Sequence, residues 1–293
     1  MNKSSFLLPV ILFIAGTLEA QDDLLSLVGE DKPKKEFVDY AFKSSRVIMS
    51  QSMEMIRPGV MDFRILHRFG NINSGLYEMF GLDNATMRMG FDFGLAKNLM
   101  IGVGRSTNKK ELDGFIKYRL FHQAIGKGGL PFSLLAVGGT SLSTLKFTDS
   151  TRKNYFSSRL AHYGQLIIGS KISDGFSLQL MPTIVHRNLV PAVEDPNDLY
   201  AVGVGSRLRL SRRISLNVDY YYRINPNPAD GTLNPLSVGF DIETGGHVFQ
   251  LHFTNAVGMN EKVFLTETTN NWSNGDIQFG FNISRSFQIR KKK

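Results

Sequence analysis

The histidines and several serines of this chain are of types that carry out acid–base and nucleophilic chemistry. The chain contains no cysteine. The missing cysteine excludes thiol catalysis, disulfides, iron–sulfur clusters and cysteine-ligated zinc. No two histidines are spaced as in His-Glu-x-x-His, so a zinc site would need ligands from distant segments. We therefore expect no metal site and no cofactor. The histidines are His67, His122, His162, His186, His247 and His252.

A lipid hydrolase is one alternative for these residues. Ser106, Ser157 and Ser158 lie near the ends of predicted strands, as do His67 and His186, and a serine activated by a histidine attacks esters. The chain has no Gly-x-Ser-x-Gly motif, however. Chance placement of common residues explains the pattern better, so we expect the protein not to be an enzyme.

The first twenty residues have the features of a secretory signal peptide. Lys3 supplies a positive charge, residues 6–14 form an apolar run interrupted only by Pro9, and Leu18-Glu19-Ala20 precedes the expected cleavage point. This run is too short to cross about 30 Å of hydrocarbon. We expect residues 1–20 to be removed on export.

The next segment, residues 21–60, is charged and irregular. Residues 22–28 could form a short amphipathic helix, and Lys32-Pro33-Lys34-Lys35 indicates a solvated break after it. We expect it to form a periplasmic lead-in, or to plug the structure that follows.

From residue 61 onward, polar and apolar residues alternate, which predicts β-strands with one apolar face. In the last segment Phe279 and Phe281 share one face, and Gln278 and Gly280 the other. Most segments exceed the roughly 5–6 residues usual in soluble sheets and match the roughly 9–11 that a tilted strand needs to cross a bilayer. The twelve predicted strands are 61–69, 85–95, 99–106, 112–123, 132–142, 156–171, 176–188, 199–210, 214–224, 235–243, 247–254 and 276–287.

The connections alternate in length. Outer-membrane barrels have short periplasmic turns and longer external loops, and here the loops after odd-numbered segments are the longer ones, except at 107–111 and 124–131. If the sheet closes into a barrel, no strand edge is left unpaired and the apolar face of each strand contacts lipid. We therefore predict an all-β fold: a closed antiparallel transmembrane β-barrel of about twelve strands over residues 61–289, in the cell outer membrane. Pro182 cannot donate to a strand ladder and predicts a bulge or a break in pairing.

Longer stretches of the chain carry a family resemblance. They include Phe63-Arg64-Ile65-Leu66-His67-Arg68-Phe69-Gly70, Met181-Pro182-Thr183, His186-Arg187-Asn188-Leu189-Val190 and Asp241-Ile242-Glu243-Thr244-Gly245-Gly246-His247-Val248-Phe249-Gln250-Leu251. In these the chain resembles a Gram-negative bacterial outer-membrane-type β-barrel family catalogued as a domain of unknown function. The resemblance covers nearly all of the mature chain. It implies an outer-membrane barrel without an assigned activity.

The predicted inward face carries charges of both signs. Charges that pair across a confined lumen would form a lattice of ion pairs that partly fills the bore, whereas unpaired arginines would favour anions in a pore. Arg207 and Arg209 could meet Asp219 on the next strand. The inward charges are Arg64, Arg68, Arg88, Lys117, Arg119, Arg187, Arg207, Arg209 and Arg223 against Asp62, Asp92, Asp219, Asp241 and Glu243.

Twelve strands lie between the eight that side chains fill and the sixteen to eighteen that enclose an aqueous channel. We expect a narrow pore for a small anionic solute, or a structural envelope protein with a closed bore. The alternatives are the lipid hydrolase and a barrel that binds a periplasmic partner through residues 21–60. The net charge of +8 does not indicate nucleic-acid binding, because the basic residues are dispersed over many strands. The expected partners are the lipid bilayer and lipopolysaccharide.

Overall fold

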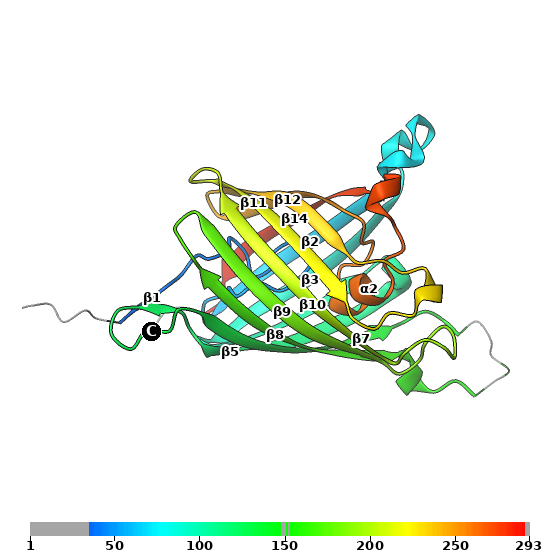
Figure 1. Ribbon diagram of the computed structural model, residues 1–293, viewed down its shortest axis with the longest axis horizontal. Coiled ribbons are helices and arrows are strands. Elements are labelled where there is room, and N and C mark those ends of the chain that lie inside the picture. Colours follow the sequence, from blue (N-terminus) through cyan, green and yellow to red (C-terminus); the bar gives the residue numbers. More distant parts are fainter. Residues whose placement is uncertain (1–34, 148–150, 152, 291–293) are drawn as a thin grey trace, which may run out of the picture.

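The structure is a computed structural model that describes residues 35–147, 151 and 153–290. The expected signal peptide lies outside the described residues. Twelve strands form a closed antiparallel barrel in which each strand pairs with the next along the chain and the last pairs with the first (Figure 1). The strands are β2 (Val60–Asn71), β3 (Ala85–Ala96), β4 (Leu99–Ser106), β5 (Glu111–Phe121), β7 (Ser133–Ser143), β8 (Leu160–Lys171), β9 (Phe176–Arg187), β10 (Asp198–Arg209), β11 (Ile214–Arg223), β12 (Leu236–Thr244), β13 (His247–Thr254) and β14 (Gln278–Gln288).

The predicted barrel and its twelve strands are confirmed. The largest difference in bounds is at β8, which was expected from residue 156 and begins at Leu160. The reason is a short 3₁₀ helix, η4 (Phe156–Arg159), whose local hydrogen bonds replace pairing with a neighbouring strand.

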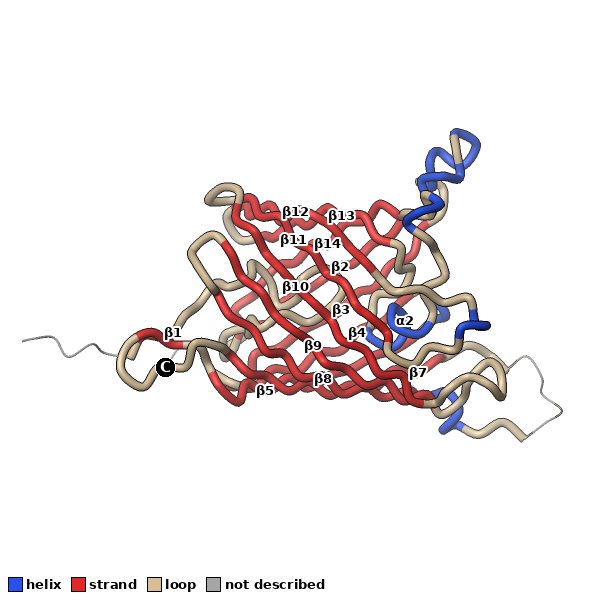
Figure 2. The backbone as a smooth tube through the Cα atoms, in the orientation of Figure 1, coloured by secondary structure: helices blue, strands red, loops and turns tan. Residues whose placement is uncertain are grey.

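The two ends of the barrel differ, as Figure 2 shows. At one end, which we call the turn end, short connections such as 97–98 and 245–246 join the strands. Longer connections such as 144–159 and 255–277 lie at the other end, which we call the loop end. The turn-end connection 122–132 is longer because it contains β6 (Ala124–Ile125), which pairs with β1 (Glu36–Phe37). That pairing explains one of the two exceptions to the predicted loop lengths.

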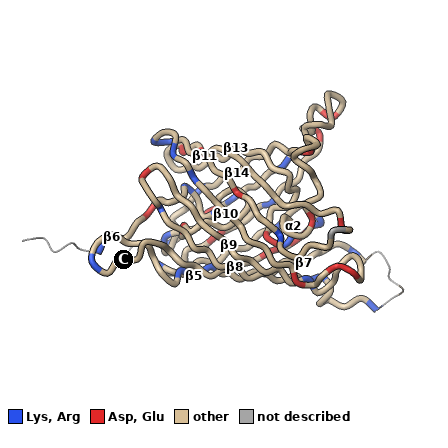
Figure 3. Tube along the Cα trace, viewed as in Figure 1, with Lys and Arg blue, Asp and Glu red and all other residues tan. Residues whose placement is uncertain are grey.

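Burial alternates along every barrel strand. On β10, Leu199 and Ala201 are buried, whereas Tyr200 and Val202 are exposed. Large apolar side chains cover the outer face of the barrel, among them Phe91, Val103, Ile116, Leu180, Tyr200, Phe240 and Leu251. Charged residues occur at the ends and at single positions along the strands, which otherwise have long uncharged stretches (Figure 3). Such an outer face requires an apolar surrounding.

Pro182 interrupts pairing on one side of β9. The ladder between β8 and β9 stops at the Gln165–Thr183 pair and resumes at Ile168–Leu180, without a shift in register. On the other side, Pro182 lies opposite Val202 of β10 in an unbroken ladder. The missing amide hydrogen of proline therefore breaks pairing locally and produces no bulge.

The hydrophobic core lies inside the barrel. Residues 41–53, which we call the inner segment, enter the lumen from the turn end, and helix α2 (Glu261–Thr266) folds into it from the loop end (Figure 1). Both pack against inward-facing apolar residues of β7 to β11, for example Leu135, Ile167 and Tyr221. Among the described residues, no helix has the length and apolar character needed to cross a membrane.

Candidate functional site

The inner segment reverses direction inside the lumen. The backbone N–H of Val47 donates to the carbonyl of Ser50 (3.0 Å), and that of Ser52 donates to the carbonyl of Ser45 (2.9 Å). Arg46 and Gln51 form an isolated antiparallel bridge between these bonds. The segment is thus a narrow hairpin whose tip is residues 47–50.

Asp219 of β11 holds this tip. Its carboxylate accepts hydrogen bonds from the backbone N–H groups of Met49 and Ser50 (both 2.9 Å) and, more weakly, from that of Ile48 (3.4 Å). The Ser50 hydroxyl donates to it as well. Consecutive N–H groups that converge on one anion form a favourable cradle for a carboxylate. Asp219 is fully buried, so these bonds replace its lost hydration.

Other polar wall residues bind the backbone of the inner segment. Gln179 accepts from the N–H of Met53 (2.9 Å) and donates to the carbonyl of Gln51 (2.7 Å). Lys117 donates to the carbonyl of Ser45 (3.2 Å). The inner segment is therefore attached to several strands through their side chains. It does not pair with any strand of the barrel as a further strand.

The inner segment also meets α2. One guanidinium nitrogen of Arg46 lies 3.3 Å from a carboxylate oxygen of Glu261, and both side chains are almost completely buried. The same nitrogen donates to the carbonyl of Met49 (2.8 Å). This ion pair joins the element that enters from the turn end to the one that enters from the loop end.

Apolar contacts add to these polar ones. At roughly 1.5–3 kcal/mol for each fully buried large apolar side chain, the apolar residues of the inner segment stabilise the filled lumen by on the order of 10 kcal/mol. Spontaneous withdrawal is therefore rare. These residues are Phe42, Val47, Ile48, Met49 and Met53.

Most of the charges expected in the lumen are buried inside the barrel. Arg119 is half-buried, and Arg209 and Glu243 lie exposed near the turn end, beyond the part of the lumen that the inner segment fills. The buried charges are Asp62, Arg64, Arg68, Arg88, Asp92, Lys117, Arg187, Arg207, Asp219, Arg223 and Asp241.

Some of these charges pair, and others do not. Arg64 contacts Asp62 (2.7 Å) and lies 3.9 Å from Asp92. Within the described residues, Arg68 and Lys117 have no carboxylate within 4.0 Å. The lumen therefore contains part of the expected lattice together with unpaired cations.

The suggested contact of Arg207 and Arg209 with Asp219 was wrong. Register explains it: Arg207 lies opposite Asn217, whereas Asp219 lies opposite Gly205. Arg207 instead donates to the Ser215 hydroxyl (2.9 Å) and to a carbonyl of the inner segment.

Several lumen residues were missed from the sequence. Asp113, which pairs with Arg88 (Nε to Oδ1, 2.8 Å), has the same parity on β5 as Lys117, so the alternation could have identified it. Arg46 and Glu261 lie in segments without a period of two, where the sequence offers no such signal.

A network of charges fixes α2 at the loop end. Lys262 contacts Glu111 (2.7 Å) and Glu267 (2.5 Å). Burial opposes the charge of Lys262, but the two carboxylates outweigh it and raise the lysine pKa. Burial likewise opposes the charge of Glu267, and Lys262 and Lys109 reverse this and lower its pKa. Paired charges thus hold α2 in place at the loop end of the barrel.

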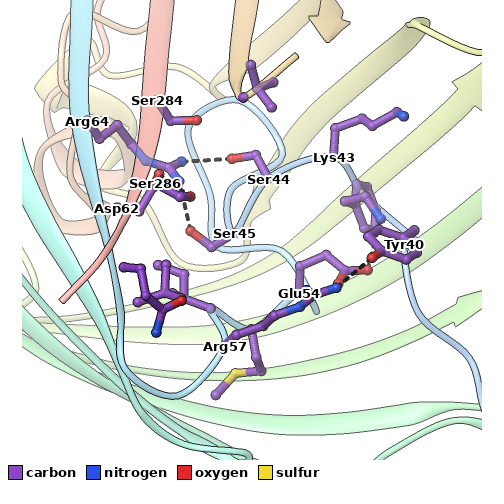
Figure 4. Close-up of a pocket in the computed structure, with 17 residues that line it drawn as sticks. Tyr40, Lys43, Ser44, Ser45, Glu54, Arg57, Asp62, Arg64, Ser284 and Ser286 are labelled. Carbon is purple, nitrogen blue, oxygen red and sulfur yellow. Dashed lines mark hydrogen bonds and ion pairs between the residues drawn. The ribbon is translucent and has the colours of Figure 1, made fainter. Parts of the chain in front are cut away.

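A cavity of about 380 Å³ opens beside the inner segment at the turn end. Figure 4 shows Arg64 pointing toward Ser44 and Ser45, whose hydroxyls accept its hydrogen bonds (both 2.9 Å). Glu54, across the cavity, accepts from the backbone N–H groups of Ala41 (2.6 Å) and Phe42 (3.2 Å). Burial raises the pKa of the Glu54 carboxyl, although these bonds oppose the shift.

The serine and histidine residues weighed for a hydrolase do not assemble. Ser106 is buried inside the barrel, and the Ser158 hydroxyl donates to the carbonyl of Tyr155. His67 stacks on Phe281 on the outer face (ring centroids 4.7 Å apart). In the described part of the chain, no group of three potential ligands is arranged to hold a metal ion.

The family model that matches this chain agrees with this architecture. A family model described as a membrane-bound beta barrel domain (DUF5777) matches residues 42–287. No curated protein matches the chain. The chain is similar to the solved NanC porin (7% identity, TM-score 0.47, covering 78% of this chain and 98% of that one). It is also similar to the KdgM porin (9%, 0.46, 78% and 99%) and to Omp33 of Acinetobacter baumannii (10%, 0.39, 78% and 97%).

Proposed function

Since this chain belongs to the DUF5777 family of membrane-bound β-barrel domains and lies in the outer membrane, we propose that it is a pore closed by its own inner segment, through which small anionic solutes pass when that segment moves. Outer-membrane barrels have their short turns on the periplasmic side. The turn end of this barrel therefore faces the periplasm. The segment therefore enters from the periplasmic side.

The charge of the wall carries this proposal. Arg68 and Lys117 are fully buried, and within the described residues neither has a carboxylate within 4.0 Å. With the inner segment withdrawn, Lys117 would lose its contacts with Ser45 and Gln51 and would face water together with Arg64. Cations without a nearby carboxylate, such as Arg68 and Lys117, favour anions.

The inner segment is the element best suited to move. Each barrel strand is held by a backbone ladder on both sides, whereas this segment is held by side-chain contacts and apolar packing. Because packing stabilises the closed state by on the order of 10 kcal/mol, opening needs energy applied at the periplasmic end. The resting protein should be closed most of the time.

Single-channel recording in planar bilayers tests the proposal. The wild-type protein should insert and stay mostly silent, whereas Asp219→Ala should open roughly five- to 150-fold more often, because it loses about 1–3 kcal/mol of contacts to the hairpin tip. In a salt gradient the open variant should prefer anions, and adding Arg68→Gln and Lys117→Gln should reduce that preference. A folded Asp219→Ala barrel that opens no more often than the wild type, or whose open state prefers cations, would contradict it.

Binding of a periplasmic partner through residues 21–60 is a second candidate. A cavity of about 750 Å³ at the turn end is lined in part by Phe37, Tyr40 and His122, and Phe37 and Tyr40 are more than half exposed. These side chains lie on the periplasmic side, where a partner has access. Phe37→Ala with Tyr40→Ala should then abolish co-purification of the partner and leave membrane insertion intact.

A further inference from the structure

Four polar side chains form a row on the outer wall of the barrel. Thr140, His162, His186 and Asp198 occupy directly opposed positions on β7, β8, β9 and β10. They point outward, because the residues next to them in sequence, such as Tyr163, are buried in the lumen. The surrounding outer face is apolar, so this row, which we call the outer polar row, is an exception to it.

Hydrogen bonds orient the two imidazole rings. His162 Nδ1 lies 2.9 Å from Thr140 Oγ1, and His186 Nδ1 lies 2.7 Å from Asp198 Oδ1. In both rings Nδ1 is therefore engaged, and Nε2 has no partner among the described residues. The ionised carboxylate of Asp198 only accepts, so it fixes His186 with a proton on Nδ1.

A hollow in the outer face lies next to the row on its membrane side. Gly138 and Gly164 are directly opposed there on β7 and β8. A Cβ atom at Gly138 would meet no atom within 4 Å. On the flanking strands, the exposed side chains of Ile116 and Ile184 border the hollow. Because neighbouring strands are about 4.8 Å apart, two bare strand positions leave roughly the width of one hydrocarbon chain.

The row lies at the loop-end rim. Asp198 is the first residue of β10, and His186 is followed only by Arg187 at the end of β9. The apolar band of an outer-membrane barrel ends toward the two rims, and we place the row at the outer edge of that band. The polar groups at the rim match a lipid headgroup, and the apolar hollow beside them matches an acyl chain.

We propose that the outer polar row binds the phosphate group of an outer-leaflet lipid, with one of its acyl chains lying over Gly138 and Gly164. The two Nε2 atoms would donate to phosphate oxygens. Because Asp198 accepts from Nδ1–H of His186, a ring that also donates from Nε2 carries a positive charge, which Asp198 on the opposite side of the ring balances.

Other functions of the row fit the geometry less well. His162, His186 and Asp198 are not arranged as a metal site. Thr140 and His162 lie at the distance of a nucleophile and a base, but the carboxylate contacts the other histidine. The flanking backbone N–H groups belong to strand ladders, so no donors are free to stabilise an oxyanion.

Native mass spectrometry of the full-length protein in detergent tests the proposal, with lipid A as the phosphate-bearing probe. The wild-type protein should retain one lipid A molecule per barrel and should not retain the dephosphorylated form. His162→Leu with His186→Leu should weaken retention by about tenfold or more, because leucine has no donor and two hydrogen bonds to a charged group are lost. Inorganic phosphate at the same concentration should not displace lipid A, since it cannot occupy the hollow.

Two further variants make the test specific. Gly138→Leu with Gly164→Leu fills the hollow and should also weaken retention, whereas His67→Gln, on the opposite side of the closed sheet, should not. Heat-modifiable migration shows that each variant remains folded. Equal retention by the double-leucine variant, or of dephosphorylated lipid A, would overturn the proposal, as would full displacement by inorganic phosphate.

Discussion

Ser50 donates two hydrogen bonds to Asp219, one from its backbone N–H (2.9 Å) and one from its hydroxyl group. The two residues are 169 positions apart in the chain, yet they form the main anchor of the inner segment. Asp219 therefore adds to the apolar packing and the other polar contacts that keep the hairpin tip in the lumen.

Replacing Asp219 should release this tip. Asp219→Ala leaves the N–H groups of Met49 and Ser50 without an acceptor, and an unsatisfied buried donor costs about 1–3 kcal/mol. We expect these two amides to exchange hydrogen roughly five- to 150-fold faster, measured by hydrogen–deuterium exchange in detergent. Asp195→Ala, in the connection between β9 and β10 at the loop end, is the control and should leave their exchange unchanged.

The Arg46–Glu261 pair should behave as a buried ion pair. Arg46→Ala leaves Glu261 buried without its cation, which costs about 3–5 kcal/mol, whereas Arg46→Met with Glu261→Leu should recover most of that loss. The measurement is urea unfolding of the purified barrel in detergent. If the single and double variants unfold at the same concentration, the pair does not couple the inner segment to α2.

Acidic pH should hold the inner segment more tightly in the lumen. Burial raises the pKa of Glu54 in the folded protein above its ordinary value of 4.5. The folded state thus favours the protonated carboxyl, so this contribution is complete below pH 4.5 and is lost as the pH rises through the raised value. The open probability in planar bilayers should therefore rise with pH over this range.

Glu54→Gln separates this effect from other titrations. The glutamine keeps an oxygen that accepts from Ala41 and Phe42 but carries no charge. The pH dependence of the open probability over this range should largely disappear. If it persists unchanged in Glu54→Gln, another group causes it.

Two neighbouring glycines should differ in their tolerance of a side chain. A Cβ atom at Gly139 would lie 2.2 Å from the ring of Tyr163 inside the barrel, whereas one at Gly138 faces open space outside. Gly139→Ala should destabilise the barrel by about 1–3 kcal/mol through overpacking. Gly138→Ala should be close to neutral in the same urea unfolding experiment. Equal effects would show that Tyr163 rearranges freely.

Some features of this protein follow from the sequence alone. The alternation of residues such as Phe279 and Gln278 depends only on the pleat of a strand, which repeats every two residues and is visible locally. Loop lengths showed how the strands are connected, and the missing amide hydrogen of Pro182 predicted the interruption in its ladder. These predictions needed no knowledge of distant contacts.

The contents of the lumen and the outer polar row were decided by tertiary structure. The inner segment has no periodicity, and its contacts with Asp219 and Glu261 depend on packing between residues far apart in sequence. Thr140, His162, His186 and Asp198 come together only through the register of four strands, and a shift of a single residue would turn each side chain to the other face. Register is set when the whole barrel closes, because every strand must match both neighbours at once. No local sequence pattern records that condition.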